Sequence, residues 1–522
     1  MHPTQFAREL ECISDSKISL LDLADELQCY ILSLLPPQDI IRCALTSRIL
    51  HSMIQASSEL KYLLELGARR LLIASGSYNI PASDRRQLLK DHVKSWDKFD
   101  LRTARRLALP EQHYESSKTF GHSHLTLSRL GNLTTRHIGI IDVDTFSGEK
   151  EMTTRVWSEP WIASTFSDPS QDLLIRVNYF LDLGASSKYY FRIDLDTISE
   201  NCAHPLARHH SLWALRRRGE SGPTSAYFSS KIVFYGELIG FYGHTNTDQV
   251  LQVWNWKTGD GSNCFVTEEF EKDPKNPTFC FLDATRLLLL GDHLHVYSIS
   301  DLSHPPRLLH SFALPYDTRG ARISSSSPDA PVLREEHSLV HTRPPMWIQD
   351  PKHQLIAVEF TYPASILLII LSNALISPPP KSTLQHGGQS VPIPWTVWGP
   401  ANSRAFVHWP SCQFGMSGTR VVQLVRAAPE PFIYNLHLAD FSPASVSRAQ
   451  TNGKAIVKPT IIPLQPGSED MMVTSLPYAD VTSEVLYDDD LINIMMDEDH
   501  LLLLKNVQEL VFGEDVVDVI KF

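Results

Sequence analysis

The most constraining feature of this sequence is a change in its apolar periodicity near residue 120. Before that point, apolar residues recur every three or four positions, which is typical of amphipathic helices. After it, helical signatures almost vanish, and short apolar or alternating runs are bounded by Gly, Asp, Asn and Pro. This predicts a long all-β region after a helical one. The predicted strands include 138–143, 173–177, 189–193, 232–234, 251–256, 278–282, 287–290, 295–299, 355–360, 366–371, 421–425, 433–438 and 501–505.

Weak internal repetition favours one all-β architecture. The sequence DPSQDLL at 168–174 is echoed by DPKHQLI at 350–356, and each reads as a turn leading into an apolar strand. Residues 251–259 (LQVWNWKTG) resemble the closing strand of a WD-type propeller blade, and 294–299 look like its neighbour. Units of about 40 to 60 residues with four strands are typical of β-propellers, and roughly 400 residues supply six to eight. A β-propeller is therefore predicted, with a double β-sandwich as the alternative. The Ser- and Pro-rich segments 322–331 and 377–394 are predicted to be surface insertions.

Three short helices are predicted within residues 20–60. Leu23, Leu27, Tyr30, Ile31 and Leu34 follow the stripe of an amphipathic helix, which Asp22 is placed to cap. The adjacent prolines at 36 and 37 end this helix, and the second of them suits the first turn of the next helix, over 38–46. A third apolar set has the same period at 49, 50, 53 and 54. Residues 83–96 predict a longer helix that bridges to the β region.

This segment resembles an F-box, the module by which substrate receptors dock on the adaptor of SCF-type cullin ubiquitin ligases. The family order of residues is present as Leu23, Glu26, Leu27, Ile31, Leu32, Leu35, Pro37, Asp39, Ile40, Ser47 and Arg48. Two positions depart from it: Ala24 stands where proline is usual, and Thr46 where valine is common. The fold class expected is α+β multidomain, with a three-helix F-box, a helical linker and a mostly β domain.

The resemblance implies a substrate receptor without chemistry of its own. Its F-box would bind the SCF adaptor and, through it, cullin, while the β domain would bind a target protein. The residues expected to line the adaptor interface are Leu23, Leu27, Ile31, Leu32, Pro37, Ile40, Leu45 and Leu50, although some of them must pack inward and the sequence does not sort them. Alternatives stay open: three ordinary helices, a propeller scaffold that never meets an adaptor, or an enzyme using the propeller's central funnel.

Length and charge set the remaining expectations. The 522 residues are divided into a tail at 1–17, an F-box at 18–62, a helical linker at 63–110 and a β domain at 111–522. A net charge of −12 argues against a nucleic-acid role that rests on a basic field. The seven cysteines form no CxxC pair, the first 17 residues lack a signal peptide's apolar core, and the most apolar run is too short to span a membrane. A cytoplasmic or nuclear protein is expected, without membrane partners.

The sequence offers no convincing catalytic or cofactor motif. GxSxG, HExxH and a phosphate loop are all missing. Two histidine pairs, at 122/124 and 293/295, would share a strand face as metal ligands do, but no third ligand is indicated. The acidic residues at 488–490 and 497–499 read as a solvated face or a docking patch. No catalytic residue, cofactor or metal site is therefore expected.

Overall fold

The computed structural model describes residues 20–74, 80–109, 117–121, 123–132, 135–145, 153–157, 162–182, 188–200, 202–214, 229–244, 249–261, 278–318, 320–325, 346–361, 365–378, 391–408, 414–427, 433–464, 469–488, 490–507 and 514–522. Helices dominate as far as residue 98 and strands dominate thereafter. Each strand predicted from the sequence overlaps a strand of the structure. The change in periodicity is thus confirmed as a change in secondary structure.

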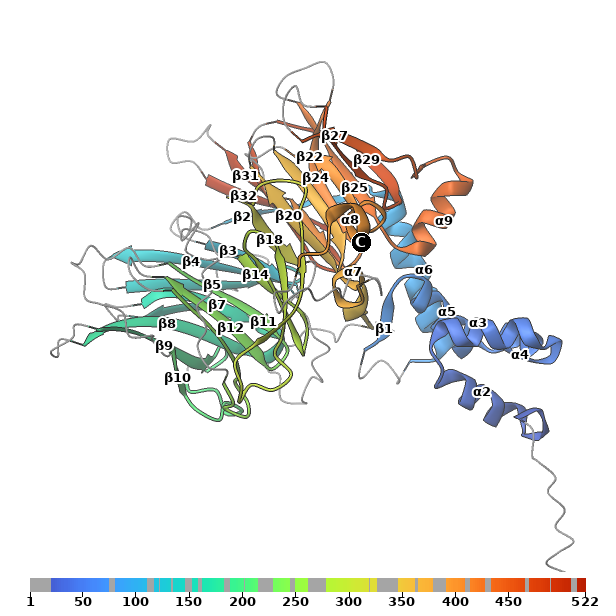
Figure 1. The fold of residues 1–522 in the computed structure, drawn as a ribbon, viewed down its shortest axis with the longest axis horizontal. Coiled ribbons are helices and arrows are strands. Elements are labelled where there is room, and N and C mark those ends of the chain that lie inside the picture. The colour runs from blue at the N-terminus through green and yellow to red at the C-terminus, as the bar shows by residue number, and fades with distance from the viewer. Residues whose placement is uncertain are drawn as a thin grey trace, which may run out of the picture.

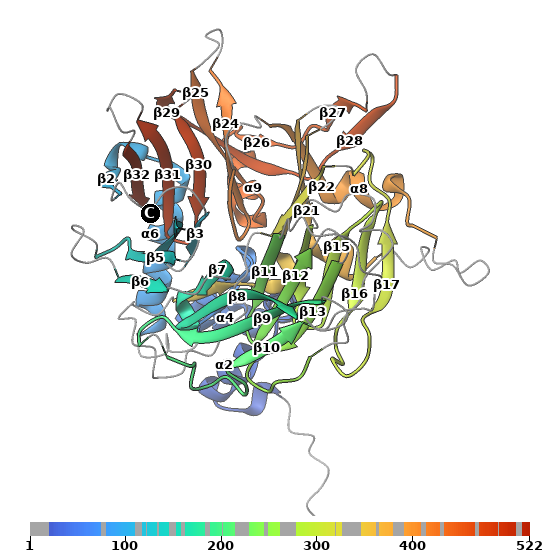
Figure 2. The same ribbon diagram turned by 90° about the vertical axis from the view of Figure 1, so that its left-hand side faces the viewer.

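Seven antiparallel sheets form the seven blades of a β-propeller, arranged as a ring in Figure 2. Blade 1 consists of β3 (Ser117–Gly121), β4 (His124–Asn132), β5 (Thr135–Asp142) and β6 (Thr153–Trp157). Blade 2 consists of β7 (Ile162–Asp168), β8 (Leu173–Asp182), β9 (Lys188–Thr197) and β10 (Ser211–Ala214). Blade 3 consists of β11 (Ser229–Tyr235), β12 (Leu238–His244) and β13 (Gln249–Asn255). The propeller is confirmed over the sandwich, with a blade count inside the predicted range.

Blades 4 to 7 complete the ring. Blade 4 consists of β14 (Thr278–Asp283), β15 (Arg286–Leu290), β16 (Leu294–Ser298) and β17 (Arg307–Phe312), and blade 5 of β18 (Arg322–Ser325), β20 (Leu355–Phe360), β21 (Ile366–Leu371) and β22 (Ser403–Val407). Blade 6 consists of β23 (Gly415–Ser417), β24 (Arg420–Arg426), β25 (Tyr434–Asp440), β29 (Tyr478–Tyr487) and β26 (Ala455–Ile456). Blade 7 consists of β30 (Leu491–Met496), β31 (His500–Val507), β32 (Glu514–Lys521) and β2 (Arg105–Ala108). One expectation is corrected here: residues 322–325 form strand β18 of blade 5, whereas 326–331 lie outside the described residues.

Blade 7 joins the two ends of the propeller sequence. Strand β2 pairs antiparallel with β32, from Arg105 opposite Val519 to Ala108 opposite Val516. This pairing covers the edge of β32, which would otherwise be open to unwanted association. The first propeller strand therefore begins at residue 105, before the expected domain start at 111, because ring closure needs a strand from the N-terminal side.

The repeat noticed in the sequence marks equivalent turns of two blades. The 3-10 turn η5 (Pro169–Gln171) precedes β8, the second strand of blade 2. The 3-10 turn η7 (Pro351–His353) precedes β20, the second strand of blade 5. Asp168 accepts a hydrogen bond from the Ser170 amide at 3.0 Å, and Asp350 accepts one from the Lys352 amide at 3.1 Å. The aspartates recur because each caps the start of a 3-10 turn.

The helices before the propeller form a separate projection, seen in blue in Figure 1. We call residues 20–68 the helical head. It comprises η1 (Leu20–Asp22), α2 (Asp25–Ser33), α3 (Pro37–Thr46), α4 (Arg48–Ala56) and α5 (Ser58–Ala68). Strand β1 (Leu71–Ile73), helix α6 (Ala82–Lys98) and the 3-10 turn η3 (Leu101–Thr103) then lead into the ring. Strand β1 pairs with β19 (Trp347–Gln349), so the head is joined to the propeller by backbone hydrogen bonds.

Three further helices and a hairpin decorate blades 5 and 6. They are α7 (Ser372–Ile376), α8 (Trp395–Asn402), α9 (Pro443–Thr451) and the hairpin of β27 (Thr460–Pro463) with β28 (Met471–Thr474). Most of the insertion predicted at 377–394 lies outside the described residues. Within the described part of the chain, every helix is too short or too polar to cross a membrane.

Candidate functional site

The helical head is held together by one small core. Side chains from all four α-helices fill it: Leu32, Ile40, Leu50, Ile54 and Leu60. Pro37 begins α3, as predicted, and its ring lies so close to Gly67 of α5 that a β-carbon there would come within 2.4 Å of it. A core of this size stabilises little by itself, so the arrangement of the remaining apolar side chains matters.

The start of α2 differs from the prediction. Asp22 ends η1, and the helix begins at Asp25 with Ala24 in the N-cap position and no side-chain cap. Asp25 and Glu26 lie in the first turn, where negative charge interacts favourably with the helix dipole. The family-atypical Ala24 is therefore tolerated, because the acidic first turn supplies the electrostatic part of a cap. At the other atypical position, Thr46 donates its hydroxyl hydrogen bond to the Cys43 carbonyl.

The outer face of α2 carries an uncovered apolar stripe. Leu27, Tyr30, Ile31 and Leu34 follow one another at the i, i+3, i+4, i+7 spacing of one helix face, and all four are exposed. On the following helices Ile41, Leu45 and Ile49 are exposed as well, Leu45 by 82 %. We call these seven residues the apolar face of the head. Large apolar side chains gathered on one small module mark an interaction site.

The structure separates the eight residues expected to line the adaptor interface into three groups. Leu32, Ile40 and Leu50 fill the core and are buried. Leu27, Ile31 and Leu45 belong to the apolar face, and Leu23 and Pro37 are half-buried. Tyr30, Leu34, Ile41 and Ile49 were not in the expected set. The sequence pattern places Tyr30 and Leu34 on the helical stripe of Leu27, but it does not assign them to the interface.

A groove lies beside the apolar face, between α2 and α4. Asp25, Glu26 and Cys29 line it from α2, and Arg48, Ile49 and Met53 from α4. It therefore combines an apolar floor with charges of both signs, as a docking surface for a helix or loop requires.

The sequence model of the F-box domain matches residues 20–62, which cover α2 to α4 and the first part of α5. Residues 20–62 of this chain are an F-box domain. The F-box thus coincides with the helical head and with its apolar face, and the chain continues into a seven-bladed propeller.

Comparison with solved structures returns matches of low similarity, among them "Crystal structure of RRP9 WD40 repeats" at 7% identity and a TM-score of 0.26, covering 69% of this chain and 94% of that one. "Structure of U3-55K" shares 8% identity and a TM-score of 0.26, covering 69% of this chain and 95% of that one. "Crystal Structure of the N-terminal Domain of Nup159" shares 9% identity and a TM-score of 0.30, covering 79% and 94%. TM-scores this low carry no argument, so the propeller rests on the sheet order described above. A comparison with curated protein sequences finds no match.

Helix α6 joins the F-box to the propeller and contacts both. Near its start, Arg85 and Arg86 form ion pairs with Glu59 and Glu65 of α5, at 2.8 and 2.7 Å. The Arg85 guanidinium also lies 4.8 Å from the ring centre of Tyr62. A small core shared with β1 and β19 follows: Tyr62, Leu66, Leu71, Leu89, Val93 and Trp347. The bridging helix predicted from the sequence therefore exists and begins on the F-box side.

The other end of α6 is inserted into the propeller through Trp96. Its indole stacks on Phe522 with ring centres 3.8 Å apart, and its Nε1 donates a hydrogen bond to the Glu498 carbonyl at 3.2 Å. The Arg420 guanidinium covers the ring at 4.6 Å. Beside it, Arg448 of α9 pairs with Asp97 at 3.0 Å. Aromatic stacking and a satisfied indole N–H make this a specific joint between helix and blades.

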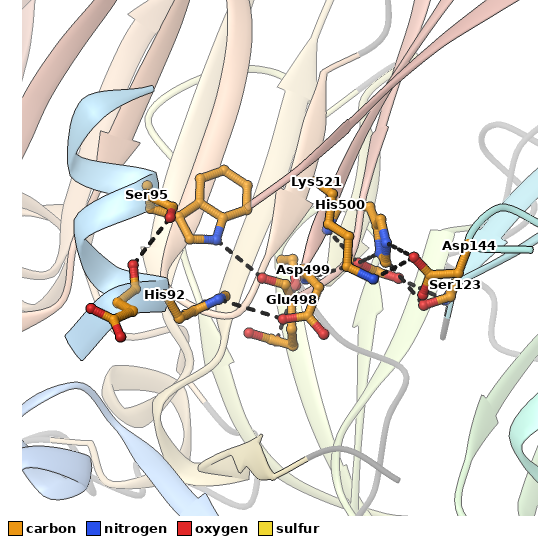
Figure 3. Close-up of polar contacts among 12 residues, drawn as sticks. His92, Ser95, Ser123, Asp144, Glu498, Asp499, His500 and Lys521 are labelled. Carbon is orange, nitrogen blue, oxygen red and sulfur yellow. Dashed lines mark hydrogen bonds and ion pairs between the residues drawn. The ribbon is translucent and has the colours of Figure 1, made fainter. Parts of the chain in front are cut away.

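An acidic turn of blade 7 lies against α6 at this joint (Figure 3). Burial raises the pKa of Glu498 to about 7, although Arg420 and a hydrogen bond from Ser417 at 3.1 Å oppose that rise. Burial likewise raises the pKa of Asp499. Its carboxylate lies 3.5 Å from Nδ1 of His92, whose own pKa is lowered by burial to about 3, so this imidazole is neutral.

Asp497 and His500 connect the same turn to blade 1. Asp497 accepts a hydrogen bond from the Ser123 amide at 2.7 Å, and His500 lies 3.1 Å from both Asp497 and Asp144. Burial acts to lower the pKa of His500, but these two carboxylates raise it above its usual value. Lys521 also pairs with Asp144. The residues 497–499, expected to form a solvated or docking face, instead make intramolecular contacts, because the ring brings α6 and blade 1 against them.

The histidine pairs do not form a metal site in the described structure. His122 lies outside the described residues, and His124 is buried. The rings of His293 and His295 are 6.0 Å apart, and His295 Nδ1 lies 2.9 Å from the Ser311 hydroxyl. Within the described ranges, His, Cys, Asp and Glu nowhere gather in threes as metal ligands would.

Proposed function

We propose that this chain is the substrate receptor of an SCF-type ubiquitin ligase, with the apolar face of its F-box bound to the SCF adaptor and its propeller bound to a target protein. One observation carries the proposal: eight large apolar side chains, the seven of the apolar face and Leu21, remain exposed on a 43-residue module that matches the F-box family. Exposed apolar surface of this kind is stabilised when a partner removes it from water.

The burial of each side chain in the head supports a set of proposed contact residues. Leu27, Ile31 and Leu45 are the expected residues that remain available, and Tyr30, Leu34, Ile41 and Ile49 join them. Leu32, Ile40 and Leu50 act indirectly, because they fix the helices that carry the contact residues. The groove between α2 and α4 extends the surface with Asp25 and Arg48, whose charges would set orientation more than affinity.

The mechanism that the architecture supports is proximity. A ligase of this kind brings a target lysine close to a charged ubiquitin-conjugating enzyme, which raises the effective concentration of the two reactants. Helix α6 has 17 residues, or a length of about 26 Å, and is packed at both ends. A fixed spacer holds the target at a constant distance from the adaptor. No residue of this chain takes part in the covalent step, and a cytoplasmic or nuclear protein fits this role.

The experiment is co-expression with the SCF adaptor, capture through a tag on the adaptor, and size-exclusion chromatography. We expect a one-to-one complex. Leu45→Asp places a charge at the most exposed apolar position of the face, where it would be buried by the adaptor, and should weaken binding at least ~100-fold while the chain stays folded. Leu486→Asp, an exposed leucine of blade 6, is the matched control and should bind as the parent chain does.

Two results would contradict the proposal in different ways. A folded Leu45→Asp chain that binds the adaptor normally would move the interface away from this face. A well-folded parent chain that forms no complex would leave the second function, a propeller scaffold for protein interactions that is not engaged with a ubiquitin ligase.

A further inference from the structure

The hairpin of β27 and β28 is an insertion of blade 6 that lies on blade 5. It follows α9 in the connection between β25 and β29, and its inner face packs on the core that blades 4 and 5 share through Met472, Ile462 and Leu464. Figure 2 shows it at the outer rim of the ring, away from the F-box helices. The hairpin is therefore a surface element of the propeller alone.

One buried arginine fixes the hairpin in place. Arg404 of β22 is fully buried and donates hydrogen bonds to the carbonyls of Leu476, Lys458 and Ile456 at 2.7, 2.9 and 3.4 Å, and to the Thr460 hydroxyl at 2.8 Å. The Ala405 amide donates to the Thr474 hydroxyl at 3.1 Å. Because a guanidinium presents several donors in a rigid plane, these bonds hold both strands of the hairpin against blade 5.

The outer face of this rigid hairpin is apolar. Ile461 lies opposite Val473, and Pro463 lies opposite Met471. Residues two apart on a strand, and directly opposite residues of neighbouring strands, share one face of a sheet. These four side chains therefore form one strip, and all of them are exposed, Ile461 by 62 %. Solvent-facing strands ordinarily alternate apolar and polar residues, whereas both faces of this hairpin are apolar.

Charge is distributed unequally along the strip. Exposed Lys458 lies at its open end, two residues before β27, and exposed Glu469 lies at its turn end, two residues before β28. A two-fold axis that lies between the two copies and runs across the strands at the middle of the strip would place the apolar side chains face to face. The same axis would bring Lys458 of each copy beside Glu469 of the other. The strip is therefore complementary to itself, which is the requirement for an isologous dimer.

We propose that the outer face of the β27–β28 hairpin is a homodimer interface, occupied by the same strip of a second copy of this chain. Four apolar side chains cover less than the ~800 Å² per partner of a standard interface, so the dimer is a weak one, with a dissociation constant in the range of about 1 to 100 µM. An arrangement of this kind would give a receptor two F-boxes and two propellers.

The test is sedimentation velocity of the full chain from about 1 to 100 µM, the range given by the estimated affinity. We expect a reversible monomer–dimer equilibrium. Ile461→Asp should abolish it, while Leu206→Asp, an exposed leucine of blade 2, should leave it unchanged. Far-UV circular dichroism checks that each chain is folded.

Charge reversal tests the two-fold arrangement itself. Lys458→Glu and Glu469→Lys should each weaken dimerisation ~10-fold, and the double variant should restore it, because both contacts are then re-formed with exchanged signs. A chain that stays monomeric up to 100 µM, a dimer that tolerates Ile461→Asp, or a double variant as weak as the single ones would overturn the proposal. Adaptor binding by Ile461→Asp should be normal, so a failure here is distinct from a failure of the receptor function.

Discussion

Helices α2 and α6 have the same kind of sequence pattern and opposite surroundings. Both carry apolar residues at helical spacing. The apolar side of α6, with Leu89, Val93 and Trp96, is covered by α5, β1 and β19 and by the blades. The apolar stripe of α2, with Leu27 and Leu34, faces solvent. The difference teaches that an amphipathic pattern shows only that one face of a helix is apolar and is stabilised by burial. Whether the cover belongs to the same chain or to a partner is decided by the tertiary structure.

The largest expected effect is on stability, and it tests this comparison at two adjacent residues of α3, one buried and one exposed. Ile40 is 0 % exposed in the F-box core, and Ile41 belongs to the apolar face. Ile40→Asp buries an unpaired carboxylate and should destabilise the F-box by about 5 kcal/mol, enough to unfold it. Ile41→Asp should change its stability by less than about 1 kcal/mol while weakening adaptor binding. Hydrogen exchange of α2 to α5 measures the first effect and adaptor capture the second. Equal protection in the two variants would show that the sorting of the head is incorrect.

The next effect tests the covered helix. Trp96→Ala removes the stack on Phe522, the Arg420 contact and the hydrogen bond to Glu498, and leaves a cavity between α6 and blades 6 and 7. We expect a loss of about 3 to 5 kcal/mol in the stability of the joint. Leu88→Ala, on the exposed side of α6, is the control. Hydrogen exchange should increase across α6 in the first variant alone. Unchanged protection in Trp96→Ala would mean that the joint does not depend on this side chain.

The smallest effect concerns pH at the same joint. Burial raises the pKa of Glu498 from 4.5 to about 7, so its protonated form is favoured in the folded protein. Its contribution to stability is therefore complete below pH 4.5 and is lost as the pH rises through 7. The joint should weaken by about 1 kcal/mol between pH 6 and 8. Glu498→Gln mimics the protonated side chain, so it should remove this dependence and protect α6 more than the parent chain at pH 8.

The neighbouring groups make that comparison interpretable. Asp497, Asp499 and Arg420 act on the pKa of Glu498, and His92 and His500 lie beside those two aspartates; all five are present in both chains. The difference between the parent and Glu498→Gln chains therefore isolates one carboxyl group. A difference that does not change from pH 6 to 8 would show that Glu498 keeps one protonation state over this range.

The sequence predicted much of the fold and part of the site. The order of residues from Leu23 to Arg48 indicated the F-box, and alternating apolar runs located the strands. Long-range pairing was beyond it: nothing local marks 105–108 as the strand that closes blade 7, or Asp497 as a partner of the Ser123 amide. Burial was only partly readable, because Ile40 and Ile41 are the same residue type at adjacent positions. Their directions from the helix axis differ by about 100°, and only the packing of α2, α4 and α5 selects the inward one.

By itself the sequence determined the periods, the turns and the order of chemical groups along the chain, since these depend on neighbours within a few residues. It thereby determined a helical F-box followed by an all-β region, and the sheet order of the structure then distinguished a propeller from a sandwich. The tertiary structure alone decided which apolar residues remain uncovered and how the acidic turn at 497–499 is used. It also gave the β27–β28 hairpin an apolar outer face. Burial and pKa are properties of everything that surrounds a side chain, and most of what surrounds these residues comes from distant parts of the chain.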